Sequence, residues 1–92
     1  MSNNYVGMER FIFAEAYNLF LKYMNMENTD YCWNELFKEQ ESFVEKYHGN
    51  VMARDMMYCI TSQMEYKLNN MEEYERENSS IVEFMRTKSK TS

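Results

Sequence analysis

The chain has 92 residues, with ten methionines, eight tyrosines and six phenylalanines but no proline and only two glycines. Fifteen acidic side chains outnumber ten basic ones, so the net charge is −5. This charge disfavours direct binding to nucleic acid or anionic membranes and favours basic protein surfaces as partners. The length fits one domain with a modest core, and no apolar run is long enough to span a membrane.

The first expected helix covers residues 8–26. Phe11 falls on its polar stripe, where an aromatic is either covered by the N-terminal arm or exposed for a partner. We expect residues 1–7 to form a flexible lead-in. Apolar residues at spacings of three and four define the predicted inner face. It is centred on Phe13, Ala16, Tyr17, Phe20 and Met24 and flanked by Ile12, Leu19 and Tyr23.

The second expected helix covers residues 30–48. Thr29 is a good N-cap, and Asp30 then lies in the first turn, where negative charge suits the helix dipole. Gly49 is expected at the C′ position, where a left-handed backbone ends many helices. The predicted inner face holds Trp33, Leu36, Phe37, Gln40, Phe43, Val44 and Tyr47.

Asn50 is the predicted cap of a third helix, which ends near residues 69–70 or continues to Glu77. The capping-box pattern from Ser80 to Glu83 predicts a short fourth helix over residues 81–87, followed by a disordered tail over residues 88–92. The sequence therefore predicts a single all-α domain over residues 1–92, a three-helix bundle with this short C-terminal helix. The third helix is expected to bury Met52, Ala53, Met56, Met57, Cys59, Ile60, Met64, Leu68 and Met71.

No residue pattern points to catalysis, a metal or a cofactor. Glu45 and His48 have the E-x-x-H spacing of carboxylate-bridged metal sites, but the motif occurs once and contains the only histidine of the chain. Cys32 and Cys59 form no C-x-x-C pair and are expected to be free thiols in a reduced, cytoplasmic setting. We therefore expect no enzyme activity, no metal and no cofactor.

The acidic face of the second helix is the candidate binding surface. Carboxylates four residues apart rise by about 6 Å along a helix, close to the spacing of about 6.8 Å between alternate phosphates of one DNA strand. Such a face fits a groove that a partner protein shapes for nucleic acid, although the same charges on many small proteins only aid solubility. Aromatic neighbours would anchor the contact, so the candidate residues are Glu35, Glu39, Glu41, Glu45, Tyr31 and Phe11.

Three segments resemble small helical proteins of unknown function from low-GC bacteria and their phages. They are residues 16–23 (Ala-Tyr-Asn-Leu-Phe-Leu-Lys-Tyr), 28–33 (Asn-Thr-Asp-Tyr-Cys-Trp) and 45–49 (Glu-Lys-Tyr-His-Gly), and the resemblance spans residues 12–68. In size, acidity and helicity the chain is also similar to anti-CRISPR proteins, small phage inhibitors of host nucleases. This similarity to anti-CRISPR proteins rests on no shared motif, so it assigns no functional residue to this chain.

The sequence favours a non-catalytic inhibitor or adaptor that binds a basic, nucleic-acid-handling protein. The alternative is a structural or regulatory homodimeric bundle whose acidity serves only solvation. A third hypothesis is a small-molecule binder or enzyme that uses the interior of a dimer. A homodimer is expected because the apolar faces of the first and third helices are wider than one neighbour covers.

Overall fold

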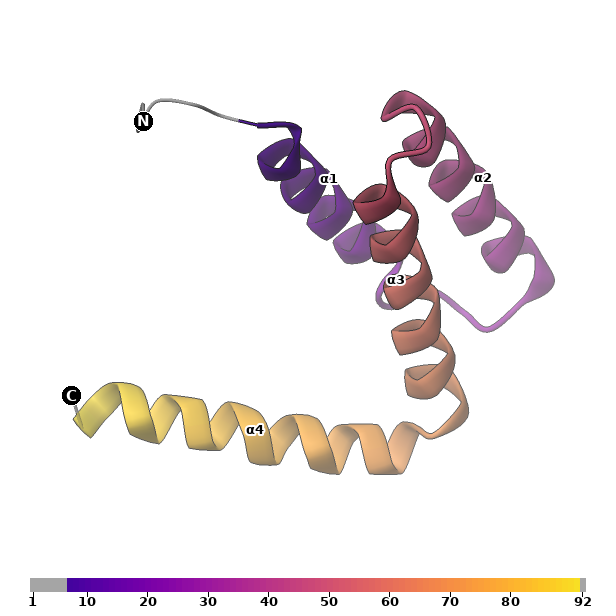
Figure 1. Cartoon of the computed structure of the whole chain (residues 1–92). Coiled ribbons are helices and arrows are strands. Elements are labelled where there is room, and N and C mark those ends of the chain that lie inside the picture. The colour runs from indigo at the N-terminus through magenta and orange to yellow at the C-terminus, as the bar shows by residue number, and fades with distance from the viewer. Residues whose placement is uncertain (1–6, 92) are drawn as a thin grey trace, which may run out of the picture. The chain divides into compact units, whose positions relative to one another are not determined.

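The computed structural model describes residues 7–91 and the side chains up to residue 88. Within that range the chain forms four helices and no strand: Met8–Tyr23 (α1), Asp30–Lys46 (α2), Val51–Asn69 (α3) and Met71–Thr91 (α4) (Figure 1). The predicted all-α class is confirmed. The chain forms two compact units, Met1–Ser62 and Gln63–Ser92, and the single domain over residues 1–92 stays a prediction. Gly7 is the N-cap of α1, and the rest of the expected lead-in lies outside the described residues.

Two helices begin at the polar residues that the sequence singles out. The backbone N–H of Cys32 donates to Thr29 Oγ1 at 3.2 Å, so Thr29 caps α2 as predicted. In the same way, the N–H of Ala53 donates to Asn50 Oδ1 at 3.1 Å and Asn50 caps α3. These caps satisfy N–H groups that have no partner inside the helix, which fixes where each helix starts.

Helix α2 ends two residues before the predicted end at His48, and its C′ position shifts by one residue. The helix stops at Lys46, and His48 takes the left-handed conformation (φ 55°) ahead of Gly49 (φ 71°). His48 N–H donates to Glu45 O at 3.0 Å and Gly49 N–H donates to Val44 O at 2.9 Å, the two bonds of a Schellman motif. His48 therefore occupies C′ and Gly49 occupies C″.

The boundary between α3 and α4 is a single residue, Asn70. Its N–H donates to Tyr66 O at 2.9 Å, and its carbonyl accepts from Tyr74 N–H at 2.8 Å. The first turn of α4 contacts the end of α3, because the Tyr74 ring lies edge-on to Tyr66 (6.3 Å between centroids) and under Lys67 Nζ (5.4 Å to the centroid). Residues 71–77 therefore start a new helix.

This early start makes α4 longer than the predicted helix over residues 81–87. Ser80 lies inside α4, so the capping-box prediction is wrong: the polar residue that starts this helix is Asn70. The helix also runs to Thr91, so residues 88–91 of the expected disordered tail are helical, and Ser92 lies outside the described part of the chain.

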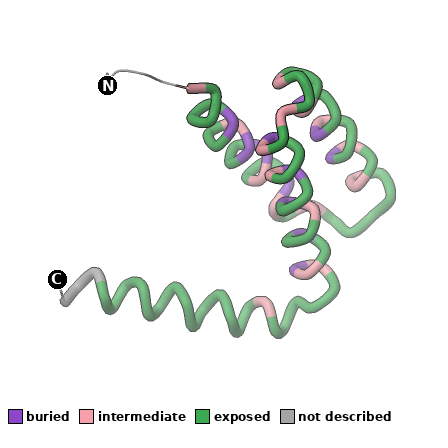
Figure 2. Tube along the Cα trace, viewed as in Figure 1, coloured by how far each residue is buried: buried purple, intermediate pink, exposed green. Residues whose placement is uncertain are grey.

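Unit 1 (Met1–Ser62) is a three-helix bundle of α1, α2 and the first part of α3. Helices α1 and α2 are antiparallel, since Lys22 pairs with Glu39 and Glu15 pairs with Lys46. Figure 2 shows the buried positions concentrated on the facing sides of these helices. The buried residues of unit 1 are Ile12, Ala16, Leu19, Tyr23, Leu36, Gln40, Phe43, Ala53, Met57 and Ile60.

The buried stripe of α1 is not centred where the sequence places it. Ile12, Ala16, Leu19 and Tyr23 form it, whereas Phe13 and Tyr17, predicted as inner residues, are 55% and 61% exposed. The prediction fails because apolar residues occur on nearly every side of α1, so periodicity alone does not select one stripe. Phe20 and Met24, also predicted inside, are half-buried.

Four further residues predicted for the core are more exposed than expected. Cys59 on α3 and Phe37 on α2 are exposed, and so is Met71, which starts α4 instead of ending the third helix. Trp33 is half-buried; its Nε1–H donates to Asn28 Oδ1 at 2.8 Å, and its ring lies 5.7 Å from the Phe37 ring. Trp33 therefore packs against Phe37 near the start of α2 instead of filling the centre of the bundle.

A buried glutamine joins α2 to α3. Gln40 Nε2 donates to the Met57 carbonyl at 3.1 Å and to Thr61 Oγ1 at 3.0 Å, and Thr61 Oγ1 lies 3.2 Å from Gln40 Oε1. Methionine-rich cores pack adaptably and specify geometry weakly. A directional polar contact among such side chains fixes the register of the two helices, because a slip would leave buried polar atoms without partners.

We predict that Gln40→Met lowers the free energy of unfolding by about 1–2 kcal/mol, because it leaves Thr61 without its buried partner. The double variant Gln40→Met/Thr61→Val should lose less than the sum of the two single variants. Urea denaturation followed by the fluorescence of Trp33, the only tryptophan, measures this. Additive losses would contradict a coupled pair.

Candidate functional site

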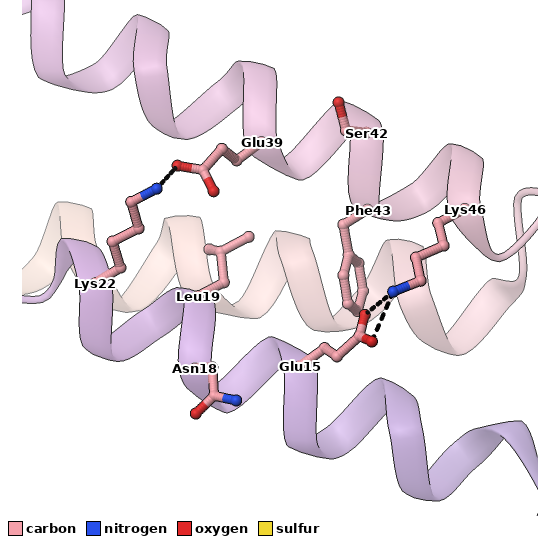
Figure 3. Close-up of a pocket in the computed structure, with 8 residues that line it drawn as sticks. All are labelled: Glu15, Asn18, Leu19, Lys22, Glu39, Ser42, Phe43 and Lys46. Atoms are coloured by element: carbon pink, nitrogen blue, oxygen red, sulfur yellow. Dashed lines mark hydrogen bonds and ion pairs between the residues drawn. The ribbon is translucent and has the colours of Figure 1, made fainter.

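A cleft between α1 and α2 is bounded by two ion pairs (Figure 3). Lys22 Nζ lies 2.6 Å from Glu39 Oε2, and Lys46 Nζ lies 2.9 and 2.7 Å from the two Glu15 carboxylate oxygens. Leu19 lies between the two pairs, and the remaining lining residues are Asn18, Ser42 and Phe43. The cleft holds about 350 Å³ and is open to solvent.

The charged groups of this cleft neutralise one another. The hydrogen bond from Lys22 lowers the pKa of Glu39, and the Tyr23 hydroxyl, which also donates to Glu39, lowers it further. Burial, and then the Glu39 carboxylate, raises the pKa of Tyr23. The hydrogen bond from Lys46 lowers the pKa of Glu15. Both carboxyl groups therefore stay ionised at neutral pH, so neither is suited to donate a proton as a general acid.

The four carboxylates predicted to bind a partner do not form one surface. Glu39 faces α1 and is bound by Lys22 and Tyr23, and Glu35 Oε2 lies 3.3 Å from Lys38 Nζ. Glu41 and Glu45 are exposed, and neither forms an ion pair within the described residues. Because α2 turns by about 100° per residue, Glu41 and Glu45 lie about 120° around the helix from Glu35 and Glu39, respectively. Only these two remain as an acidic surface.

The two predicted aromatic anchors are exposed but far apart. Phe11 is in the first turns of α1, whose start lies beside the α2–α3 turn, where Asn50 Nδ2 donates to Met8 Sδ at 3.8 Å. Tyr31 is in the first turn of α2, at the other end of a 17-residue helix that is about 25 Å long. Phe11 and Tyr31 cannot contact one small partner segment together.

The described residues do not bring a set of metal ligands together. No group of three or more His, Cys, Asp or Glu side chains suited to hold an ion occurs among the described residues. His48 of the E-x-x-H pattern is exposed on the α2–α3 turn, and the thiols of Cys32 and Cys59 are free.

An apolar groove runs between α1 and α3 in unit 1. It holds about 260 Å³ and is open on one side. The α1 side of the groove is aromatic, with Phe13, Tyr17 and Phe20 at spacings of four and three residues. Side chains with this spacing lie on the same face of a helix. Every residue that lines it is apolar or aromatic: Phe13, Ala16, Tyr17, Phe20, Met56 and Ile60.

The groove exists because α1 carries more apolar surface than α2 and α3 cover. A helix that is apolar on all sides is normally buried in an assembly. The periodicity of the sequence predicts that Phe13 and Tyr17 are buried. The apolar face of α1 is wider than its neighbours can cover, and this width indicates that part of the face stays exposed. The large hydrophobic side chains of α1 that remain exposed are Met8, Phe11, Phe13, Tyr17 and Leu21.

The groove and the acidic surface lie on different sides of unit 1. Helix α2 contacts both α1 and α3, through the ion pairs and through Gln40, whereas the groove lies between α1 and α3. The outward side of α2, with Glu41 and Glu45, is therefore away from the groove. Residues 1–62 carry nine acidic and five basic side chains, so the apolar groove belongs to a unit with a net charge of −4.

Comparison with known proteins found no matching family model, no similar curated protein and no similar solved structure. The resemblance to small proteins of low-GC bacteria and their phages therefore stays a prediction. Within residues 7–91, no helix combines the length and the apolar character that crossing a membrane requires.

We predict that the stabilising effect of Glu39 depends on pH. A lowered pKa means that Glu39 favours folding fully above its ordinary value of 4.5 and loses this effect as the pH falls through the folded-state pKa. Glu39→Gln should cost at most about 1 kcal/mol at pH 7, because the carboxylate is 39% exposed, and nothing in strong acid.

Thermal or urea unfolding across the acidic range measures this difference. Glu45→Gln is the matched control for the loss of one carboxylate from α2, since Glu45 forms no ion pair in the described structure. A Glu39→Gln curve parallel to that of the parent would refute the role of the Lys22–Glu39–Tyr23 contacts.

Proposed function

We propose that this protein is a non-catalytic binding protein that takes a helical segment of a basic partner protein into the groove between α1 and α3. The observation that carries the proposal is the uncovered aromatic face of α1, where Phe13 and Tyr17 are exposed beside Met56 and Ile60. Monomeric proteins rarely expose a contiguous apolar surface that has no partner.

The shape of the groove favours a helix as its occupant. Amphipathic helices bind in apolar grooves through side chains spaced three, four and seven residues apart. Aromatic side chains with the same spacing line the groove on α1: Phe13, Tyr17 and Phe20. On α3, Met56 supplies an adaptable side chain opposite them. The partner segment would complete the bundle as a further helix.

The charge of unit 1 favours a basic partner. With a net charge of −4, the unit attracts a helix whose polar side carries lysine or arginine and repels an acidic one. Glu41 and Glu45 lie away from the groove, so they would speed the encounter instead of anchoring the bound helix. Proteins that handle nucleic acid carry such basic segments, and occupying one would inhibit or adapt its owner.

The alternative is a structural or regulatory bundle whose exposed apolar residues and acidity bind no other protein. That hypothesis predicts that exposed groove residues can be replaced with no effect on any interaction. The two hypotheses differ in whether the protein binds a cationic amphipathic helix: the proposal predicts binding and the alternative does not.

The test uses two synthetic peptides of about 20 residues with leucine at helical spacing, one with lysine and one with glutamate at the polar positions. We predict that the Leu/Lys peptide binds the parent more tightly than the Leu/Glu peptide, and that raising the salt concentration reduces this preference. Fluorescence anisotropy of labelled peptides measures both affinities.

The double variant Phe13→Ser/Tyr17→Ser should weaken binding of the Leu/Lys peptide at least about tenfold, since aromatic side chains dominate such contacts. Tyr31→Ser/Tyr58→Ser is the matched control: it removes two exposed tyrosines that do not line the groove. Equal losses in both variants, or none in either, would contradict the proposal. The same pair then identifies the natural partner, as the protein that the parent and the control capture and the groove variant does not.

A further inference from the structure

Helix α4 carries an apolar stripe that nothing covers within the described structure. Ile81, Phe84 and Met85 are 55%, 63% and 57% exposed, and Val82 is exposed beside them. Figure 2 shows exposure along nearly the whole described length of α4. Asn78, Ile81 and Met85 follow the spacing of three and four residues by which paired helices form a seam, and Val82 widens it.

The sequence of α4 does not favour a helix that stands alone in water. Asn78, Ser79 and Ser80 lie in its middle, and all three have lower helix propensity than alanine, leucine or glutamate. Most helices in proteins gain their stability by packing an amphipathic face. A 21-residue helix with an exposed stripe and this centre therefore needs a partner for the stripe.

The charges of α4 are divided between its two halves. Residues 71–77 hold four glutamates and one arginine, a net charge of −3, and residues 78–91 hold one glutamate and three basic residues, a net charge of +2. This polarity suits the helix dipole. It also makes α4 complementary to a second α4 that runs in the opposite direction, because each acidic half then lies beside a basic half.

We propose that two copies of this chain pair through α4 in an antiparallel arrangement, with Ile81, Val82 and Met85 in the seam. A crossing point between Ser80 and Ile81 places Glu75 of one copy beside Arg86 of the second copy. At about 100° per residue both side chains fall on the same flank of the stripe, and a two-fold axis repeats the contact. Neither Glu75 nor Arg86 forms an ion pair within the described chain.

A parallel pair would place like charges together, Glu75 beside Glu75 and Arg86 beside Arg86 of the second copy.

In the antiparallel pair, Asn78 lies in the seam. One polar residue there favours a single register at some cost in affinity. An interface of one helix from each copy is small, so we expect a dissociation constant in about the micromolar range.

Sedimentation equilibrium of the full chain between about 5 and 200 µM tests the pairing, a range that brackets the affinity expected of a small interface. The parent should approach twice its 11.3 kDa mass as the concentration rises. Ile81→Glu/Met85→Glu should remain monomeric, because it buries charge in the seam. Ser80→Glu/Thr87→Glu adds the same charge on the opposite face of α4 and should dimerise like the parent.

A charge exchange tests the orientation. Glu75→Arg and Arg86→Glu should each raise the dimer dissociation constant several-fold, and the double variant should restore it, because it keeps the net charge and rebuilds the opposite pairs. Trp33 fluorescence reports whether unit 1 is folded in each variant. A parent that stays monomeric at 200 µM, or a dimer unaffected by the Ile81/Met85 changes, would overturn the proposal, and a double variant no better than the singles would overturn the antiparallel orientation.

These outcomes are independent of the groove. The variant Phe13→Ser/Tyr17→Ser alters only exposed residues of α1 and should dimerise like the parent. If it loses dimerisation while the Ile81/Met85 variant keeps it, the self-association belongs to the groove and pairing through α4 is wrong.

Discussion

Helix α1 has apolar residues on nearly every side but only two neighbouring helices in its unit. Helices α2 and α3 cover the stripe of Ile12, Ala16, Leu19 and Tyr23, and the aromatic residues Phe13 and Tyr17 are left at the surface. A 62-residue unit has too few elements to enclose such a helix, because small domains bury a limited share of their surface. The groove and the proposed function both follow from this surplus of apolar surface.

The same helix determines what the acidic residues can do. Two ion pairs join α1 to α2 in an antiparallel arrangement, Lys22 with Glu39 and Glu15 with Lys46. Glu39 and Glu15 are therefore occupied by partners within the bundle. The acidity of the sequence is therefore partly structural, and only Glu41 and Glu45 of the predicted surface remain unpaired in the described chain. Exposed ion pairs contribute little stability each, so their main effect is to set orientation. In the proposed function, apolar contacts bind the partner and the net charge selects its class.

The features predictable from the sequence are those that depend on neighbouring residues. Thr29 and Asn50 cap their helices as expected, because capping needs only a side chain and the next turn. The inner face of α1 was misassigned, since a helix apolar on many sides gives no unique stripe. The pairing of Glu39 with Lys22 depends on helix packing, which periodicity does not contain. Asn70 separates α3 from α4, so α4 begins before Ser80 and the capping-box pattern at Ser80 does not start a helix.

The proposed function requires the uncovered face of α1 to bind a partner. Methyl NMR of the ten methionines tests it most directly, because Met56 lines the groove, Met57 is buried and Met85 lies on α4. During titration with the cationic Leu/Lys peptide, we predict that the Met56 methyl signal shifts strongly and that of Met85 stays in place. A Met56 signal that does not move, with the largest shift at Met85 or at no methionine, would contradict it.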